Sequence, residues 1–243
     1  EGILNMRKKT PRSNKPSSRA LVPAGQTKPY PIASTTIEAS QIFRVPQRHP
    51  SGEGPWQNES DKIAWTDSAT GLPCTILRSE DGSLGGYVGV RNDHPLFGFT
   101  VDALPGALGI SPHGGLDYAA TCQRGPEETS ICHPSPTARQ PRRPSRGDAQ
   151  ASGEGREGHE PLWWFGFQCN KNHDHVPGRY PGLMPGIGHE NGKTYRDEAY
   201  VYSQTTRLAL QLHSIGNPSA TDGTSLDPSD SSPPVGLDPE RRS

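Results

Sequence analysis

The 243-residue chain has few of the side chains from which hydrophobic cores are built. Only 30% of its residues are hydrophobic, whereas an ordinary globular domain has about 45–50% on a slightly broader definition. Its 28 glycines and 26 prolines concentrate in three segments that contain too few apolar residues to bury a core. We therefore expect only about half of the chain to fold.

Several absences narrow the range of functions. No apolar run approaches the ~18 residues that span a bilayer, so no membrane partner is expected. No signal peptide is visible, because Ser and Pro follow the basic start where an apolar stretch should lie. No Walker A, GxGxxG or GxSxG motif occurs. The cysteines form no CxxC pair, and we expect reduced thiols in a cytoplasmic or virion-associated protein; they are Cys74, Cys122, Cys132 and Cys169.

Charge is balanced over the whole chain but uneven along it. The formal net charge is −1, which gives no global electrostatic case for binding nucleic acid or an anionic membrane. Residues 1–28 carry seven Lys and Arg against Glu1 alone, whereas the C-terminal tail is acidic. A short basic arm can contact phosphate, so nucleic acid is a candidate partner. A solvated, disordered arm is the favoured interpretation.

Composition divides the chain into three parts. Residues 1–58 are expected to be a disordered basic arm, in which Ile42–Val45 could pin an edge strand. Residues 59–216 are expected to form a single domain, interrupted by a disordered insertion at 123–158 that is rich in Pro, Arg and Gly. Residues 217–243 are expected to be a disordered tail.

Local patterns predict four strands and one helix. Cys74–Arg78 and Gly86–Val90 flank an Asp-Gly turn and indicate a hairpin. Gly115–Ala119 is a third strand, and the continuous apolar run Leu162–Cys169 is a central strand that we expect beside it. Tyr195–Ile215 is expected to be a helix with one apolar face, preceded by a capping box of Thr194 with Asp197. The predicted fold is α+β: a small, mainly antiparallel sheet of about four or five strands, packed by one C-terminal helix.

The most informative segment is Leu162–His175, an apolar run that ends abruptly in metal- and proton-competent side chains. A second segment, His113-Gly114-Gly115-Leu116-Asp117-Tyr118, is placed to supply the opposite wall of a site. An apolar strand that delivers polar groups at its end is a common way to hold a site rigidly.

The chain resembles a group of small phage and prophage proteins of uncharacterised function. Five segments in the same order carry the resemblance: Gly71–Cys74, Gly86–Val90 with Asp93-His94-Pro95, His113–Tyr118, Trp163–Phe167 with Cys169 and Asp174, and Tyr195–Val201. They cover most of the expected core and neither tail, and no characterised activity comes with them. In that family an acid precedes the cysteine and a histidine follows two residues after it, whereas this chain has Gln168 and Lys171 at those places.

Side chains that bind transition metals gather in the two informative segments. The candidate metal ligands are His113, Asp117, His173, Asp174 and His175, with the Cys169 thiol nearby. Imidazole, carboxylate and thiolate suit a divalent transition metal such as zinc. On extended backbone His173 and His175 share a face, and on a strand His113 and Asp117 do too. No ligand spacing of high specificity is present, so the favoured alternative is that Asn170–His175 is a polar turn.

Two other uses of these residues compete with a metal. Cys169, with a histidine as base and an aspartate to orient it, would form a nucleophilic triad, although a lone cysteine beside an apolar run is far more often inert. A site for a small ligand would use the paired glycines to bring backbone close to the ligand. Its residues would be His113, Gly114, Gly115, Asp117, Trp164 and Cys169.

Three functions remain open from the sequence. The first is a phage- or prophage-type accessory protein that binds a small ligand or a protein partner without catalysis. The second is a metal-dependent hydrolase or nuclease that uses the His/Asp/Cys cluster. The third is a virion or structural component.

Overall fold

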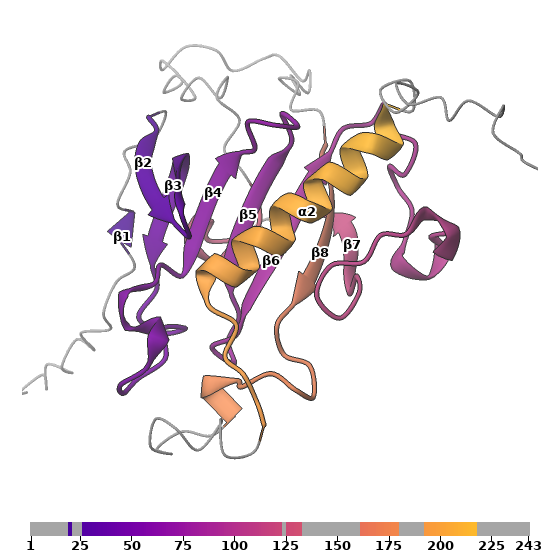
Figure 1. The fold of residues 1–243 in the computed structure, drawn as a ribbon. Helices are drawn as coiled ribbons and strands as arrows, with labels where there is room; N and C mark the ends of the chain where they lie inside the picture. Colours follow the sequence, from indigo (N-terminus) through magenta and orange to yellow (C-terminus); the bar gives the residue numbers. More distant parts are fainter. Residues whose placement is uncertain (1–18, 21–25, 123–124, 133–160, 180–191, 218–243) are drawn as a thin grey trace, which may run out of the picture.

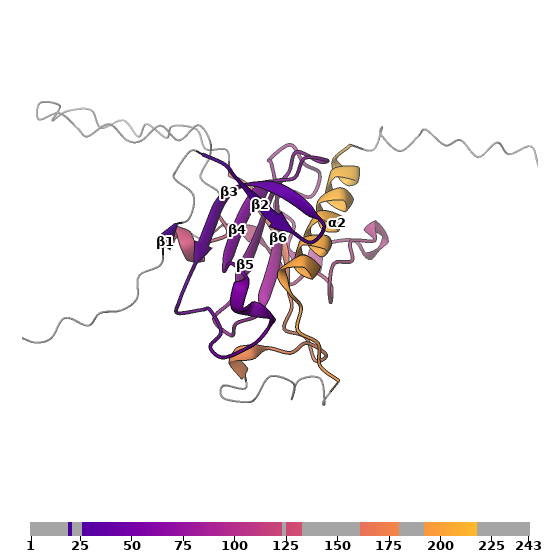
Figure 2. The same cartoon turned by 60° about the vertical axis from the view of Figure 1, so that its left-hand side comes forward.

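An antiparallel sheet with one long helix across one face forms the centre of the molecule (Figures 1 and 2). The computed structural model describes residues 19–20, 26–122, 125–132, 161–179 and 192–217. Within these ranges no helix is both long and apolar enough to cross a membrane. The predicted α+β class is confirmed, and the C-terminal helix packs on the antiparallel sheet as predicted.

The sheet has eight strands, more than the four or five expected, in the order β1-β3-β4-β5-β6-β8-β7, with β2 also pairing along β3. Every strand pair is antiparallel. The strands are β1 (Arg19–Ala20), β2 (Lys28–Ile32), β3 (Thr35–Arg44), β4 (Lys62–Thr66), β5 (Pro73–Arg78), β6 (Leu84–Val90), β7 (Tyr118–Thr121) and β8 (Trp163–Gln168). The predicted hairpin is confirmed as β5 and β6, and the predicted neighbours β7 and β8 do pair.

The additional strands come mainly from the segment that was expected to be a disordered arm. β3 is a ten-residue strand inside the sheet, paired with β4 on one side and with β1 and β2 on the other. Its register shifts between Ala39 and Gln41. Such a bulge changes which face successive residues point to, so the period of two breaks in the middle of the strand. The expectation of disorder is therefore wrong for β2 and for the first half of β3. The strand expected at Ile42–Val45 does form, but it lies inside the sheet rather than at an edge.

The helix α2 (Glu198–Gly216) packs across β5 and β6. Val201, Leu208 and Leu212 are fully buried, as the predicted apolar face requires. A side chain at Gly86 of β6 would collide with the Thr205 hydroxyl, so this glycine allows the helix to approach the sheet closely.

The helix begins three residues later than predicted, because a different residue caps it. The carboxylate of Asp197 accepts the backbone N–H of Tyr200 at 2.8 Å, which makes Asp197 itself the N-cap. The described residues also include five short 3₁₀ helices: η1 (Pro55–Asn58), η2 (Val101–Ala103), η3 (Gly106–Leu108), η4 (Glu127–Thr129) and η5 (Pro177–Arg179).

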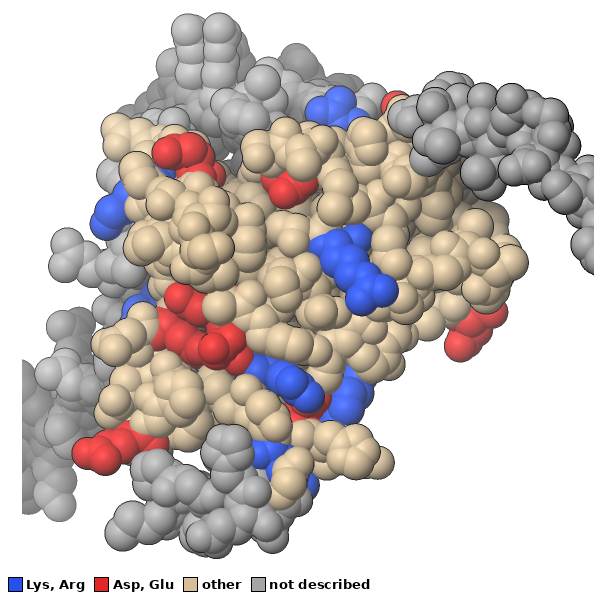
Figure 3. All heavy atoms as spheres, viewed as in Figure 1, with Lys and Arg blue, Asp and Glu red and all other residues tan. Residues whose placement is uncertain are grey.

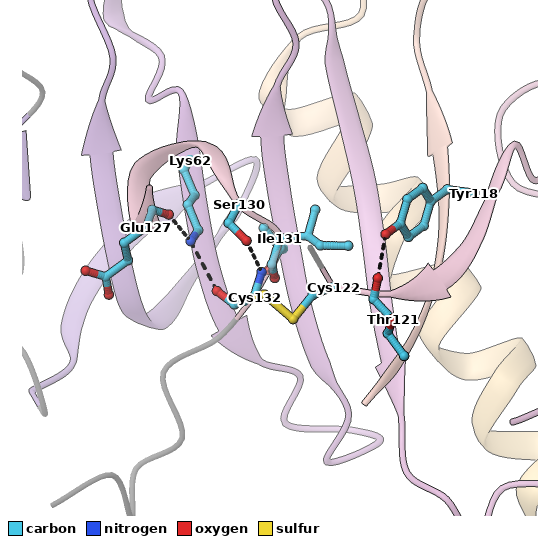
Figure 4. The surroundings of a disulfide bond; sticks show 9 residues. Lys62, Tyr118, Thr121, Cys122, Glu127, Ser130, Ile131 and Cys132 are labelled. Atoms are coloured by element: carbon cyan, nitrogen blue, oxygen red, sulfur yellow. Dashed lines mark hydrogen bonds between the residues drawn. A yellow bond between two sulfur atoms is a disulfide. The ribbon is translucent and has the colours of Figure 1, made fainter. Parts of the chain in front are cut away.

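A short loop closed by a disulfide covers part of the opposite face of the sheet (Figure 4). Ile131 of this loop packs with Leu77, Tyr87 and Trp164. The bond joins Cys122 to Cys132, so the expectation of four reduced thiols is wrong for this pair. Residues 125–132 are therefore part of the fold, although they were assigned to a disordered insertion; residues 133–160 lie outside the described ranges.

The same loop holds a buried lysine. The Lys62 ammonium donates to the backbone carbonyls of Glu127 at 2.6 Å and Cys132 at 3.3 Å (Figure 4). Burial lowers the pKa of Lys62 to about 8. The two carbonyls replace the water that the ammonium loses on burial, so the disulfide loop reduces the cost of burying this charge.

The packing of α2 predicts that Leu208→Asp unfolds the protein. The change places a charge at the centre of the buried helix face, and we expect a loss of about 4 kcal/mol or more in the free energy of unfolding. Leu210→Asp is the matched control, because Leu210 lies on the same helix and is 52% exposed. Urea denaturation measures both, and equal stabilities of the two variants would show that α2 does not dock as described.

The disulfide predicts a second stability difference. Replacing both Cys122 and Cys132 with Ser should lower the free energy of unfolding by about 3 kcal/mol, because the covalent link between residues ten apart no longer restricts the unfolded chain. A reducing agent should lower the stability of the wild type by a similar amount and leave the double variant unchanged. Wild-type protein that is insensitive to reductant would contradict the cross-link.

Candidate functional site

The paired glycines form a turn rather than the start of a strand. Gly114 and Gly115 have φ angles of 66° and 84°, a region that glycine adopts without strain, and β7 begins only at Tyr118. His113 and Asp117 therefore do not share a strand face, and the argument from their spacing is wrong. The turn instead directs His113 away from Asp117 and towards the helix.

His113 is held between a buried carboxylate and a helix tyrosine. Its Nε2 lies 2.7 Å from Oδ2 of Asp174, and its Nδ1 lies 2.9 Å from the Tyr200 hydroxyl. The Asp174 side chain is 1% exposed. It also accepts hydrogen bonds from Nε of Arg196 at 3.0 Å and from the backbone N–H of Lys171 at 2.9 Å. The arrangement joins the His-Gly-Gly turn, the segment after β8 and the first turns of α2.

These contacts set the protonation of Asp174. Burial alone would raise the pKa of this carboxyl, but hydrogen bonds from His113, Arg196 and Lys171 lower it below its ordinary value of 3.8. Both oxygens of Asp174 and both nitrogens of His113 are used within the protein. The cluster resembles a proton relay in composition, yet its hydrogen-bonding groups are directed at one another.

The remaining metal candidates do not join this cluster. His173 is exposed, and the ring of His175 stacks on Trp56 with centroids 6.0 Å apart. Asp117 forms a 2.6 Å ion pair with Lys171 at the surface. Across the described ranges, no three His, Cys, Asp or Glu side chains are placed to hold one metal ion. The predicted zinc site is therefore not supported, and the segment after β8 is a turn, with Asp174 as its buried centre.

The candidate ligand site is divided by the sheet. Trp164 is fully buried on the face that the disulfide loop covers, packed with Leu77 and Tyr87. Cys169 belongs to the core on the helix face, and its burial raises the pKa of its thiol. A protonated, buried thiol is a poor nucleophile, so the cysteine mechanism loses its reactive group. Of the predicted set, His113, Gly114 and Gly115 form one turn, and Asp117 follows two residues later, paired with Lys171.

A second buried polar cluster was not predicted. The guanidinium of Arg78, at the end of β5, lies 2.7 Å from Glu59 and 2.6 Å from Asp61. It also donates to the Tyr195 hydroxyl at 2.9 Å, and His49 lies 2.7 Å from Asp61. The only sequence signals were an arginine ending an apolar strand and two acids just before another. Arg78, Glu59 and Asp61 are almost completely buried, so the cluster stabilises the fold rather than presenting groups to a ligand.

An open apolar hollow lies in the segment between β6 and β7. Its volume is about 330 Å³, and it is lined by Phe97, Gly98, Phe99, Thr100 and Ala103. Phe99 is 39% exposed, which is unusual for so large an apolar side chain in this structure. The segment is attached to β8, because the Trp163 indole donates to the Phe99 carbonyl at 3.0 Å and the Trp163 ring contacts Phe97.

Comparison with known proteins adds no relative. No protein-family model, curated protein or solved structure matches the chain. The site therefore has to be interpreted from its own geometry.

Asp174→Asn tests whether the His113 cluster stabilises the fold. The charge that His113 and Arg196 face is removed, and we expect the free energy of unfolding to fall by about 2 kcal/mol near neutral pH. The lowered pKa of Asp174 means that its contribution is full above pH 4 and is lost as the pH falls further. The difference between wild type and variant should therefore close in acid, as urea denaturation at several pH values would show.

The control for this variant is Asp117→Asn. The Asp117–Lys171 pair is about one-third exposed, so its loss should cost less than about 1 kcal/mol. If Asp174→Asn were no more harmful than Asp117→Asn, the cluster would not be a structural brace.

Proposed function

We propose that the protein is a non-catalytic binding protein, an accessory protein of the phage or prophage type, that accepts an apolar group of a small ligand or protein partner in the hollow at Phe97–Ala103. The observation that carries this proposal is the contrast between two regions. The His113 cluster directs its polar groups inward, whereas the hollow leaves the Phe99 ring open to solvent.

The segment that forms the hollow is anchored to the rest of the fold by hydrogen bonds. Besides the Trp163 contacts, His94 Nε2 lies 2.8 Å from the Leu212 carbonyl on α2, and the Gln211 side chain donates to the Gly109 carbonyl at 3.0 Å. The segment around the hollow is therefore fixed to both β8 and α2. A segment that is already anchored in this way loses less conformational entropy on binding than a free loop would.

The electrostatics of the molecule suit an uncharged group at this site. No Lys, Arg, Asp or Glu lines the hollow. On the face that carries α2, acidic and basic side chains lie in small groups among uncharged surface (Figure 3). The residues of the basic arm before Arg19 lie outside the described ranges, so the structure adds no support for a nucleic-acid partner.

The resemblance to phage and prophage proteins is consistent with this part of the molecule. Its motif segments include β6, the His-Gly-Gly turn, β8 and the start of α2, and His113 joins the turn to Asp174 after β8 and to Tyr200 of α2. The proposal assigns these motifs a structural task, namely fixing the turn and the segment before it to the sheet. Gln168 and Lys171 fit that task, since Lys171 pairs with Asp117 and Gln168 bonds Ser79.

A virion component is the second candidate, and the disulfide favours it. Disulfides persist in oxidising surroundings, including particle surfaces, and are rare in a reducing cytoplasm. Of the two expected locations, host cytoplasm and virion, the Cys122–Cys132 bond fits the second better.

Phe99→Ser tests the binding site. Titration with the apolar dye anilinonaphthalene sulfonate should give several-fold weaker binding to the variant, because the exposed ring that covers one wall is removed. Leu210→Ser is the matched control, as Leu210 is the other large exposed apolar residue in the described ranges and lies on α2. Equal dye binding by the Phe99 variant and wild type would remove the hollow from consideration.

A further inference from the structure

We propose that two copies of this chain associate through β7, edge to edge and antiparallel, to give one continuous sheet. This inference is independent of the apolar hollow and goes beyond the binding function proposed above. It rests on the contrast between the two edges of the sheet and on the hydrogen-bonding pattern of β7.

At the opposite edge, β1 contributes only Arg19 and Ala20, and the outer side of β2 is blocked against further pairing. Its sequence is Lys28-Pro29-Tyr30-Pro31-Ile32, and it pairs with β3 through its inner side. Proline has no N–H, so prolines in a strand lie where the nitrogen faces away from the ladder. Pro29 and Pro31 therefore leave this outer edge without amide donors, and Lys28 adds a charge. Proline and lysine are the devices by which natural sheets prevent edge pairing.

The edge formed by β7 has none of these devices. Its residues are Tyr118, Ala119, Ala120 and Thr121, with no proline, no charge and no bulge within the strand. In the described ranges β7 pairs only with β8, at the end of the strand order. A neutral edge that carries neither proline nor bulge can template another strand, although the four-residue length of β7 limits how many hydrogen bonds it can offer.

The ladder shows which backbone groups of β7 face outward. The Cys169 N–H donates to Leu84 of β6, whereas the Gly166 carbonyl accepts from Asp117 on the β7 side. Even-numbered residues of β8 therefore face β7, where Gly166 lies opposite Tyr118 and Trp164 opposite Ala120. Tyr118 and Ala120 consequently point to β8, and Ala119 and Thr121 point outward.

The two outward residues make the edge complementary to itself. When two copies of β7 lie antiparallel with their Ala120 residues opposite each other, Ala119 of each copy faces Thr121 of the other. Each such pair exchanges two backbone hydrogen bonds, so the interface has about four. The Tyr118 hydroxyl already donates to the Thr121 carbonyl at 2.9 Å, but a carbonyl oxygen has two lone pairs and can accept a second bond.

The side chains favour a second copy over a charged or bulky partner. Ala120, at the centre of the proposed twofold axis, carries only a methyl group, so the strands can approach without a steric obstacle. The strand is neutral, and pairing it with itself brings no like charges together. A four-residue edge buries little surface, so the dimer should be weak and in exchange with monomer.

Sedimentation velocity and amide hydrogen exchange of the full chain test this inference together. The mass should rise with concentration from 26.2 kDa towards twice that value. The outward amides of Ala119 and Thr121 should gain protection as the dimer forms, whereas the amide of Ala120, which faces β8, should be protected throughout. A chain that stays monomeric, or a dimer in which the Ala119 and Thr121 amides gain no protection, would overturn the proposal.

Two substitutions locate the interface. Ala119→Pro removes an outward N–H that the β7–β8 ladder does not use, and Thr121→Lys places charges near each other across the twofold axis. Both should shift the monomer–dimer equilibrium towards monomer by about tenfold or more. Thr36→Lys is the matched control, because Thr36 is an exposed strand threonine of β3 at the other end of the sheet, and it should dimerise as the wild type does. Circular dichroism of each variant checks that the fold is retained; wild-type association of folded Thr121→Lys would overturn the proposal.

Discussion

The arrangement of sheet and helix depends on the ion pairs and hydrogen bonds made by the buried guanidinium of Arg78. A buried charge is tolerated only when it is paired and hydrogen-bonded, and this one requires Glu59 and Asp61 together. Asp61 lies immediately before β4, and Glu59 also accepts the Tyr195 hydroxyl and the Glu198 backbone N–H at the start of α2. One arginine thus links the end of β5, the entrance to β4 and the beginning of the helix, so these elements cannot shift independently.

The segment Tyr195–Tyr200, which leads into α2, connects the Arg78 cluster to the His113 cluster. Tyr195 and Glu198 point to the Arg78 side, where Glu198 bonds the Tyr30 hydroxyl of β2 at 2.9 Å. Arg196 and Tyr200 point to the other side and hold Asp174 and His113. Neighbouring residues of one short segment therefore supply both clusters. The Arg78 and His113 clusters contain the residue types of catalytic sites, but in this fold they fix the orientation of α2 on the sheet.

The sequence predicted the elements whose signals are local. The apolar spacing from Val201 to Leu212 and the Asp-Gly turn of the β5–β6 hairpin each depend on neighbouring residues, and both are confirmed. β3 was predicted only in part, as a possible edge strand at Ile42–Val45, because its bulge interrupts the alternating pattern at Ala39. The partners of Arg78 and the Cys122–Cys132 bond depend on contacts that form only in the folded chain, and spacing alone contains no sign of them. The metal prediction failed for a related reason: composition placed histidines and aspartates together, but the fold pairs them with Tyr200, Arg196 and Lys171 instead.

The faces and edges of the sheet differ in how far other parts of the described chain cover them. α2 covers one face of the sheet, the disulfide loop covers part of the other, and prolines block the β2 edge. β7 has no such cover among the described residues, and Trp163, opposite Thr121, contacts the segment that exposes Phe99. Both exposed features therefore lie at the same end of the sheet, beside the turn that His113 fixes. Among the described residues, this end of the sheet is therefore where backbone hydrogen-bonding groups of a strand and a large apolar ring are both left uncovered.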